Sequence, residues 1–180
     1  MAICNPTGSL SVTIREEIRL PNGNMEQSIN TEVIKNVNQI MKRTDTIAPT
    51  FSGSGIEILK FVDSEEQQTA GSFVRDTVKY MRFTNLCSTN FVSLYLIQDS
   101  PEAQNPNTGN VGSGDESLFK LDAGKSMVFS NAQFQGTDYY DYVVEGYVDI
   151  QYFSSFASLS SIKAKADTAN VQIEYFVASS

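Results

Sequence analysis

Hydrophobic and polar residues alternate one by one along the first part of the chain, as they do in a strand with one exposed face. Leu10, Val12 and Ile14 are each followed by a polar residue. Residues 21–24 read Pro-Asn-Gly-Asn, and an Asn-Gly pair accepts the positive φ values of a tight turn. Residues 10–20 and 25–29 are therefore predicted to form a β-hairpin.

The longest stretch of β-forming residues lies at 76–100. Its segments 78–83 and 91–97 are rich in β-branched and aromatic residues. Four turn-forming residues separate them: Asn85, Ser88, Thr89 and Asn90. This pattern predicts a second β-hairpin. Because 91–97 is apolar on both alternating faces, we expect it to lie at the centre of a sheet that is covered on both sides.

One segment, 31–44, has a different spacing. Its apolar residues fall at intervals typical of a helix, and Thr31 is a suitable N-cap. They are Val33, Ile34, Val37, Ile40 and Met41. Asn36 and Asn38 are poor helix formers, so a strand is the alternative. The spacing favours one short helix here, ending before Pro49.

Further strands are predicted at 56–61, 118–121, 127–129, 143–152, 162–167 and 171–177. Short turns at 122–125 and 168–170 make two more hairpins of their neighbours. Many short strands at about ten-residue spacing indicate a mainly β fold, an antiparallel β-sandwich of jelly-roll type.

The polar segment 63–72 is the best candidate for a boundary within these 180 residues. We expect 1–62 to be an accessory unit with the N-terminal hairpin, and 73–180 to be the sandwich domain. The accessory unit has few strands and a short apolar face, so it is not expected to fold alone.

Composition narrows the function classes. The chain has no His, which removes the commonest general base and metal ligand, so we expect no enzyme activity, no metal and no cofactor. Its net charge of −8 disfavours contact with nucleic acid or with anionic membranes. Cys4 and Cys87 match no metal-binding or redox spacing. Buried free thiols are expected, and a disulfide is the alternative. Neither a signal peptide nor an apolar run long enough to cross a bilayer is seen.

Two irregular segments, 98–117 and 135–142, are the candidate contact regions. Long loops in a compact domain are often functional or pack on a neighbour. The second segment contains the candidate interface or glycan contacts: Asp138, Tyr139, Tyr140, Asp141 and Tyr142. Tyr beside carboxylates is typical of protein interfaces and also of sugar-binding or glycoside-hydrolysing sites.

Two short motifs point to turns rather than to ligands. Gly124-Lys125-Ser126 resembles the end of a phosphate-binding loop, but Phe119 stands where that motif needs Gly, and a strand follows instead of a helix. The carboxylates of Asp115, Glu116 and Asp122 lack the spacing of a known Ca²⁺ loop.

Four segments carry a family resemblance: SVTIREEIRLPNGN (11–24), VKYMRFTNLCSTNFVSLYL (78–96), ESLFKLDAGKSMVF (116–129) and SLSSIKAKADTANVQIEYFVA (158–178). Their order is similar to that of small virion structural proteins of tailed bacteriophages, particularly marine phages. The resemblance is a pattern of strand edges over most of the chain.

This resemblance implies a non-enzymatic virion protein, in the capsid decoration or the neck and tail, that is made in the host cytoplasm. Its expected partners are copies of itself and other virion proteins. A carbohydrate-binding β-sandwich that recognises a glycan through the Tyr-rich segment is the alternative, and a carboxylate-based hydrolase is the third hypothesis.

Overall fold

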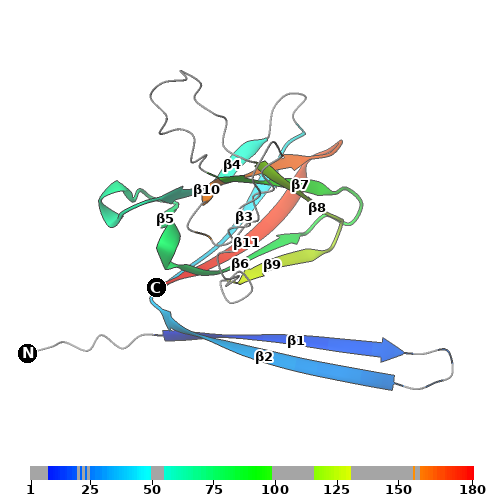
Figure 1. The fold of residues 1–180 in the computed structure, drawn as a ribbon. Coiled ribbons are helices and arrows are strands. Elements are labelled where there is room, and N and C mark those ends of the chain that lie inside the picture. The colour runs from blue at the N-terminus through cyan, green and yellow to red at the C-terminus, as the bar shows by residue number, and fades with distance from the viewer. Residues whose placement is uncertain are drawn as a thin grey trace, which may run out of the picture.

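The computed structural model describes residues 8–19, 21, 23, 25–49, 55–98, 116–130, 156 and 159–180. Two sheets pack face to face as a β-sandwich, and a separate two-stranded hairpin lies beneath them (Figure 1). The mainly β, sandwich-like fold expected from the sequence is thereby confirmed.

The five-stranded sheet has the order β5-β4-β10-β7-β8. Its strands are β4 (Ile56–Val62), β5 (Ser72–Val74), β7 (Val92–Gln98), β8 (Glu116–Leu121) and β10 (Leu159–Ala166). All neighbours are antiparallel except β4 and β5, which run parallel. Two short 3-10 turns, η1 (Glu65–Gln67) and η2 (Arg75–Thr77), flank β5.

The four-stranded sheet has the order β3-β11-β6-β9 and is antiparallel throughout. Its strands are β3 (Gln39–Ile47), β6 (Val78–Asn85), β9 (Ser126–Ser130) and β11 (Val171–Ser179). The hairpin consists of β1 (Gly8–Arg19) and β2 (Met25–Val37). The N-terminal hairpin prediction is confirmed, with a return strand longer than expected.

The strand pairs follow a nested order across the two sheets. With β5 set aside, the first sandwich strand pairs with the last (β3 with β11), and the second with the last but one (β4 with β10). Inside these pairs lie β6 with β9 and β7 with β8. Among the described strands, each of these pairs thus joins one strand from residues 39–98 to one from residues 116–179.

Three predicted hairpins are wrong in one respect. The strands of each pair, β6 and β7, β8 and β9, and β10 and β11, lie in different sheets, so the chain crosses the sandwich at each turn. A crossing and a hairpin use the same turn-forming residues. The alternation of apolar and polar residues along each strand is also the same in a hairpin and in a crossing, because it depends only on which face of the strand is buried.

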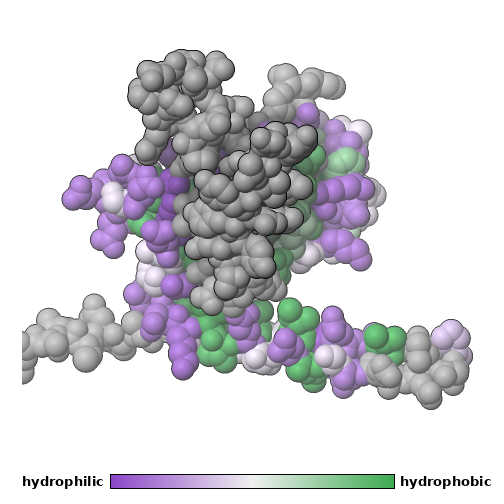
Figure 2. Space-filling view, in the orientation of Figure 1, coloured by the Kyte–Doolittle hydropathy of each residue, from purple (hydrophilic) through white to green (hydrophobic). Residues whose placement is uncertain are grey.

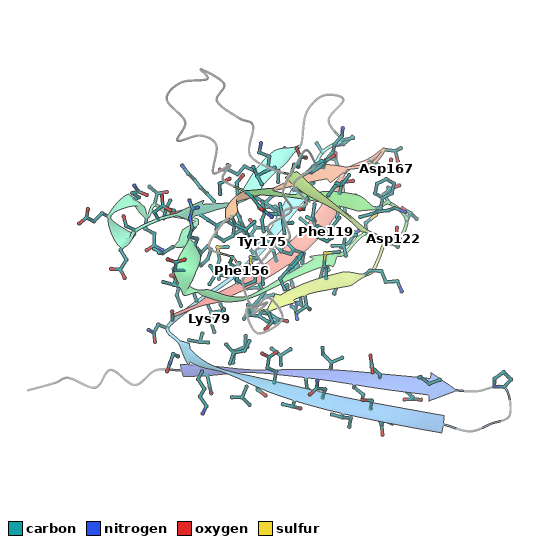
Figure 3. The ribbon with its side chains drawn as sticks, in the orientation of Figure 1. Lys79, Phe119, Asp122, Phe156, Asp167 and Tyr175 are labelled. Atoms are coloured by element: carbon teal, nitrogen blue, oxygen red, sulfur yellow. The ribbon has the colours of Figure 1, made fainter. Side chains whose placement is uncertain are left out.

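These crossings meet at one end of the sandwich, around Asn85. Its side-chain amide donates to the carbonyl oxygens of Asn90 (2.9 Å) and Leu121 (3.1 Å), and its Oδ1 accepts from the Cys87 N–H (2.9 Å). Its backbone N–H donates to the Lys125 carbonyl (2.9 Å). One buried side chain therefore ties the β6–β7 crossing to the β8–β9 crossing. Asp122 and Asp167, which follow β8 and β10, lie at this same end (Figure 3).

The helix favoured for 31–44 is wrong. This segment forms the end of β2 and the start of β3, which Asn38 separates. Asn36 has a φ of 60°, and the register between β1 and β2 shifts beside it. A residue with positive φ ends a helix, and Asn is among the residues that tolerate it. The register shift also moves the alternation of apolar residues by one position, so that their spacing in the sequence is the same as in a helix.

The core lies between the two sheets. Along β7 the inward residues Val92, Leu94 and Leu96 are fully buried, whereas Tyr95 and Ile97 on the other face are half-buried. β7 lies between β10 and β8, so its central place in a sheet is confirmed, although its outer face is only partly covered. Phe156 and Tyr175 are among the largest buried side chains, and Figure 3 shows both between the sheets.

The segment 63–72 does not separate the sandwich from the rest of the chain. β3 and β4 precede it and β6 follows it, and all three belong to the two sheets. Of the described residues, 8–37 form the part outside the sandwich. The hairpin of β1 and β2 is called the arm below.

Candidate functional site: the projecting arm

The arm is a regular two-stranded ribbon. β1 and β2 are paired along their length, from Gly8 opposite Val37 to Arg19 opposite Met25. Thr13 and Thr31 share a hydrogen bond of 3.1 Å across the ladder. At the turn Gly23 has a φ of 82°, a conformation that glycine adopts without strain. The turn and the alternation of the two strands are features of the local sequence.

The base of the arm packs on the outer face of the four-stranded sheet. Four arm residues take part: Leu10, Val12, Ile34 and Val37. They form one cluster with sheet residues from β6, β9 and β11: Tyr80, Val128, Phe176 and Ala178. The register shift beside Asn36 brings both Ile34 and Val37 into this cluster, although their separation of three residues would otherwise place them on opposite faces. The bulge is therefore part of the anchor.

Aromatic and polar contacts complete the anchor. The rings of Tyr80 and Phe176 meet edge to face at 6.0 Å between centroids. The Ser130 hydroxyl donates to the Glu32 carboxylate of the arm at 3.3 Å. Burial raises the pKa of Tyr80 above its ordinary value, Arg82 opposes this shift, and Glu32 adds to it.

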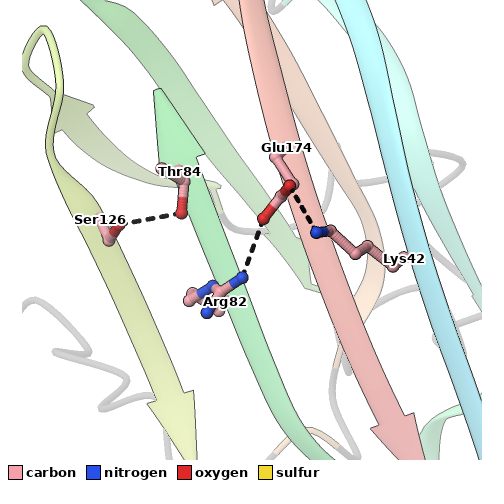
Figure 4. Close-up of polar contacts among 5 residues, drawn as sticks. All are labelled: Lys42, Arg82, Thr84, Ser126 and Glu174. Carbon is pink, nitrogen blue, oxygen red and sulfur yellow. Dashed lines mark hydrogen bonds and ion pairs between the residues drawn. The ribbon is translucent and has the colours of Figure 1, made fainter. Parts of the chain in front are cut away.

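Figure 4 shows an ion-pair network on the four-stranded sheet. Glu174 pairs with Lys42 at 3.0 Å and with Arg82 at 2.8 Å, so one carboxylate links β3, β11 and β6. The hydrogen bond from Lys42 is the largest cause that lowers the pKa of Glu174. Arg82 also lies over the Phe176 ring at 6.0 Å. Lys42 and Arg82 are 61% and 38% exposed, so the network lies at the surface of the sheet.

Beyond the anchor, the arm exposes large apolar side chains on both of its faces. Ile14 and Ile18 are 48% and 55% exposed on one face, and Ile29 and Val33 are 62% and 55% exposed on the other. Figure 2 shows hydrophobic residues interspersed with hydrophilic ones along the arm. An isolated two-stranded hairpin is at best marginally stable in water. This half of the arm is therefore the strongest candidate contact surface in the described residues.

Sequence reasoning placed the contact surface elsewhere. The candidates Asp138, Tyr139, Tyr140, Asp141 and Tyr142 lie outside the described residues, as does nearly all of the segment 98–117. The arm was predicted as a hairpin but not as a contact surface. The available signal was that the hairpin register places Ile14 and Ile18 of one strand and Ile29 and Val33 of the other on opposite faces, so one covering sheet could not bury both pairs.

The segment Gly124-Lys125-Ser126, which resembles the end of a phosphate-binding loop, has a structural role. Gly124 occupies a tight turn with a φ of 67°, and the Lys125 N–H donates to the Asp122 carbonyl at 3.1 Å. Ser126 begins β9 and bonds to Thr84 at 2.8 Å. The turn that the sequence favours over a phosphate loop is thus confirmed.

The described residues hold no cluster of three or more Asp, Glu or Cys side chains suited to a metal ion. Glu116 begins β8 and Asp122 follows its end, so these two carboxylates lie at opposite ends of that strand, and Asp115 is outside the described residues. Asp122 pairs instead with Lys120 at 2.8 Å.

Among the described residues, no helix has the length and hydrophobicity to cross a membrane.

Cys87 is a free thiol and is half-exposed, so its predicted burial is wrong, while Cys4 lies outside the described residues. The Thr89 and Asn90 backbone N–H groups face the sulfur and lower the pKa of Cys87 to about 7. Cys87 lies in the crossing between β6 and β7 and not within a strand, which explains its exposure.

A cleft of about 530 Å³ lies between the start of β3 and the segment that joins η1 to β5. Glu65 is the charged residue among those that line it, and the rest of the lining is small, amide or apolar. One carboxylate without a second charged group offers neither an acid–base pair nor a metal site. The arm therefore remains the leading candidate.

Comparison with known proteins gives no relative: no protein-family model, no curated protein and no solved structure matches this chain.

Proposed function

We propose that this chain is a non-enzymatic structural protein of a tailed-phage virion, in the capsid decoration or in the neck and tail, and that it acts through repeated protein–protein contacts. The observation that carries the proposal is the arm, which leaves the sandwich and presents Ile14, Ile18 and Ile29 without a covering partner among the described residues. Apolar surface of this kind marks interaction sites in folded proteins.

The energetics of the arm favour a partner. Fully burying one Ile side chain contributes about 1.5–3 kcal/mol, and ordering each backbone residue costs about 1–2 kcal/mol. The base offsets this cost through its cluster on the sheet, but the outer half has only its own ladder. A neighbouring subunit that covered the exposed side chains would supply the missing burial.

The fold is compatible with this role. Its nested strand pairing supports the jelly-roll type of sandwich, which viral capsid and lectin domains both use. The resemblance of 78–96, 116–129 and 158–178 to phage virion proteins points to the first of these two uses. No contact in the described residues favours a glycan.

Purified particles test the virion role. Phage particles whose genome encodes this chain should retain it through repeated density-gradient purification, at a constant ratio to the major capsid protein by quantitative mass spectrometry. Loss of the chain during purification, or a ratio that varies between preparations, would contradict a structural role.

Self-association tests the role of the arm. The double variant Ile14→Ser/Ile18→Ser should raise the dissociation constant of the assembly by roughly 10- to 100-fold, because two half-exposed Ile side chains lose apolar burial. Light scattering after size-exclusion chromatography gives the mass at each concentration. Leu86→Ser is the matched control, since Leu86 is 49% exposed and lies in the crossing between β6 and β7, outside the arm. An equal effect of both variants would contradict an assembly role for the arm.

A further inference from the structure

We propose that the arm of one copy docks on the outer face of the five-stranded sheet of a second copy of this chain, with Glu16 opposite Lys163 and Lys165. The proposal rests on the assembly role of the arm and names its partner. It follows from an apolar stripe on the arm, a lysine-framed apolar face on the sandwich, and the positions of the two surfaces.

The arm contributes one continuous stripe. Leu10 and Val12, which are anchored on the sheet, share a face of β1 with Ile14, Glu16 and Ile18, because alternate strand residues point the same way. The outer half of this face continues the established contact beyond the edge of the anchor. It offers two Ile side chains with one carboxylate between them.

The receiving face lies on the far side of the core. Tyr95 is opposite Lys163 of β10 on one side and Leu118 of β8 on the other. These residues point outward, because Leu94 and Leu96 beside Tyr95 point into the core. Leu118 is 61% exposed. The face therefore has an apolar centre.

Lysines surround this centre. Lys165 lies opposite Ser93, two residues along the face from Lys163. Lys60 of β4 and Ile97 of β7 are both opposite Ser161, in the next row of the same face. The same face also holds Lys120, opposite Ser93, and two carboxylates, Glu57 opposite Lys163 and Glu116 opposite Ile97. Four lysines against two carboxylates leave this face with an excess of positive charge, although the whole chain has a net charge of −8.

The charged side chains of the two surfaces can pair with each other between two copies. On the other face of the arm, Arg15 and Glu17 already pair at 3.8 Å. Glu16 has no ion-pair partner among the described residues, and the same holds there for Lys163 and Lys165. Complementary charges at the rim of an apolar contact favour association and select the correct partner.

The positions of the surfaces determine the kind of assembly. The arm lies on the outer side of the four-stranded sheet, and the lysine-framed face is on the opposite side of the sandwich (Figure 1). A contact between two different surfaces runs head to tail, so it produces a ring if it closes and a helical stack if it does not. Packing the Glu16 faces of two arms together would instead bring like charges into contact.

Charge reversal in the full chain tests this docking. Glu16→Lys and Lys163→Glu should each raise the dissociation constant of self-association by about tenfold or more, because each places like charges at the contact. An equimolar mixture of the two variants should regain the wild-type mass. In the mixture, the Lys at position 16 meets the Glu at position 163, and the other arm meets an unchanged face. Glu65→Lys, at an exposed position on η1, is the control and should associate like the wild type.

Each outcome is informative. Weak association of both single variants with recovery in the mixture supports arm-to-face docking. If Lys163→Glu associates normally, or if the mixture does not recover, the proposed docking face is wrong, although the arm retains its assembly role provided that Ile14→Ser/Ile18→Ser dissociates the protein. A wild-type chain that stays monomeric up to a protein concentration of about 1 mM overturns both proposals.

Discussion

Replacing Asn85 by Ala should be among the most damaging single substitutions in this protein. The Asn85 side chain is fully buried at the end of β6 and makes three hydrogen bonds to the chain around it. Its partners belong to two different crossings between the sheets, because Asn90 precedes β7 and Leu121 ends β8. Removing the amide therefore loosens both crossings together.

The magnitude follows from these contacts. Two of the three hydrogen bonds are partly buried, and each contributes about 1 kcal/mol net. The third is buried, and leaving the Leu121 carbonyl without this donor costs about 1–3 kcal/mol. Together with the small cavity left behind, the expected loss in the free energy of unfolding is about 3–5 kcal/mol, a large part of the roughly 5–15 kcal/mol typical of a domain.

Urea denaturation measures this loss. With an m-value of about 2 kcal/mol/M, the midpoint should fall by roughly 1.5–2.5 M. Asn170→Ala is the control, because Asn170 is exposed in the turn before β11 and should change stability by less than about 0.5 kcal/mol. A loss below about 1 kcal/mol for Asn85→Ala would refute the reasoning, since the crossings would then be held by their backbones alone.

A second variant separates geometry from polarity. Asn85→Asp keeps an acceptor for the Cys87 N–H but turns a carboxylate oxygen toward the carbonyls of Asn90 and Leu121. It should be more damaging than Asn85→Ala at neutral pH and recover partly in mild acid, where a protonated carboxyl can donate. A loss that does not change with pH would contradict the assigned hydrogen-bond directions.

Three further predictions concern the core and two titrating side chains. Leu94→Ala should cost about 2–5 kcal/mol in urea denaturation, because Leu94 is fully buried in β7, and a loss under about 1 kcal/mol would contradict its place in the core. Burial and the hydrogen bond to Asp45 (2.5 Å) raise the pKa of Tyr175. Stability should thus be complete below the ordinary Tyr value of about 10 and fall as the pH rises above it, and Tyr175→Phe should reduce this fall in alkaline thermal melts. Because its pKa is about 7, Cys87 should react with iodoacetamide at pH 7 faster than Cys in an unstructured peptide, and equal rates in native protein and peptide would contradict the lowered pKa.

Several features were determined by the sequence itself. The alternation at 10–14, the turn at 21–24 and the β-forming runs at 78–83 and 91–97 predict strands that the structure contains. The turn at Gly124 is of the same kind, because a residue with positive φ followed by β-forming residues permits few conformations. These features depend on residues that are close in sequence, so a single chain is enough to infer them.

Other features were decided by the tertiary structure. Whether the chain turns back within one sheet at 86–91 or crosses to the other depends on residues far away, since β6 pairs with β9 and β11 while β7 pairs with β8 and β10. The register shift beside Asn36 is likewise favoured by burial of Ile34 and Val37 on Tyr80, which is more than forty residues away. In the sequence, the exposed Ile side chains of the arm cannot be distinguished from core residues. Their hydrophobicity indicates that they favour burial, but it does not indicate which surface covers them. Strand identity is thus a local property, whereas sheet membership and the contact surface of the arm depend on long-range packing.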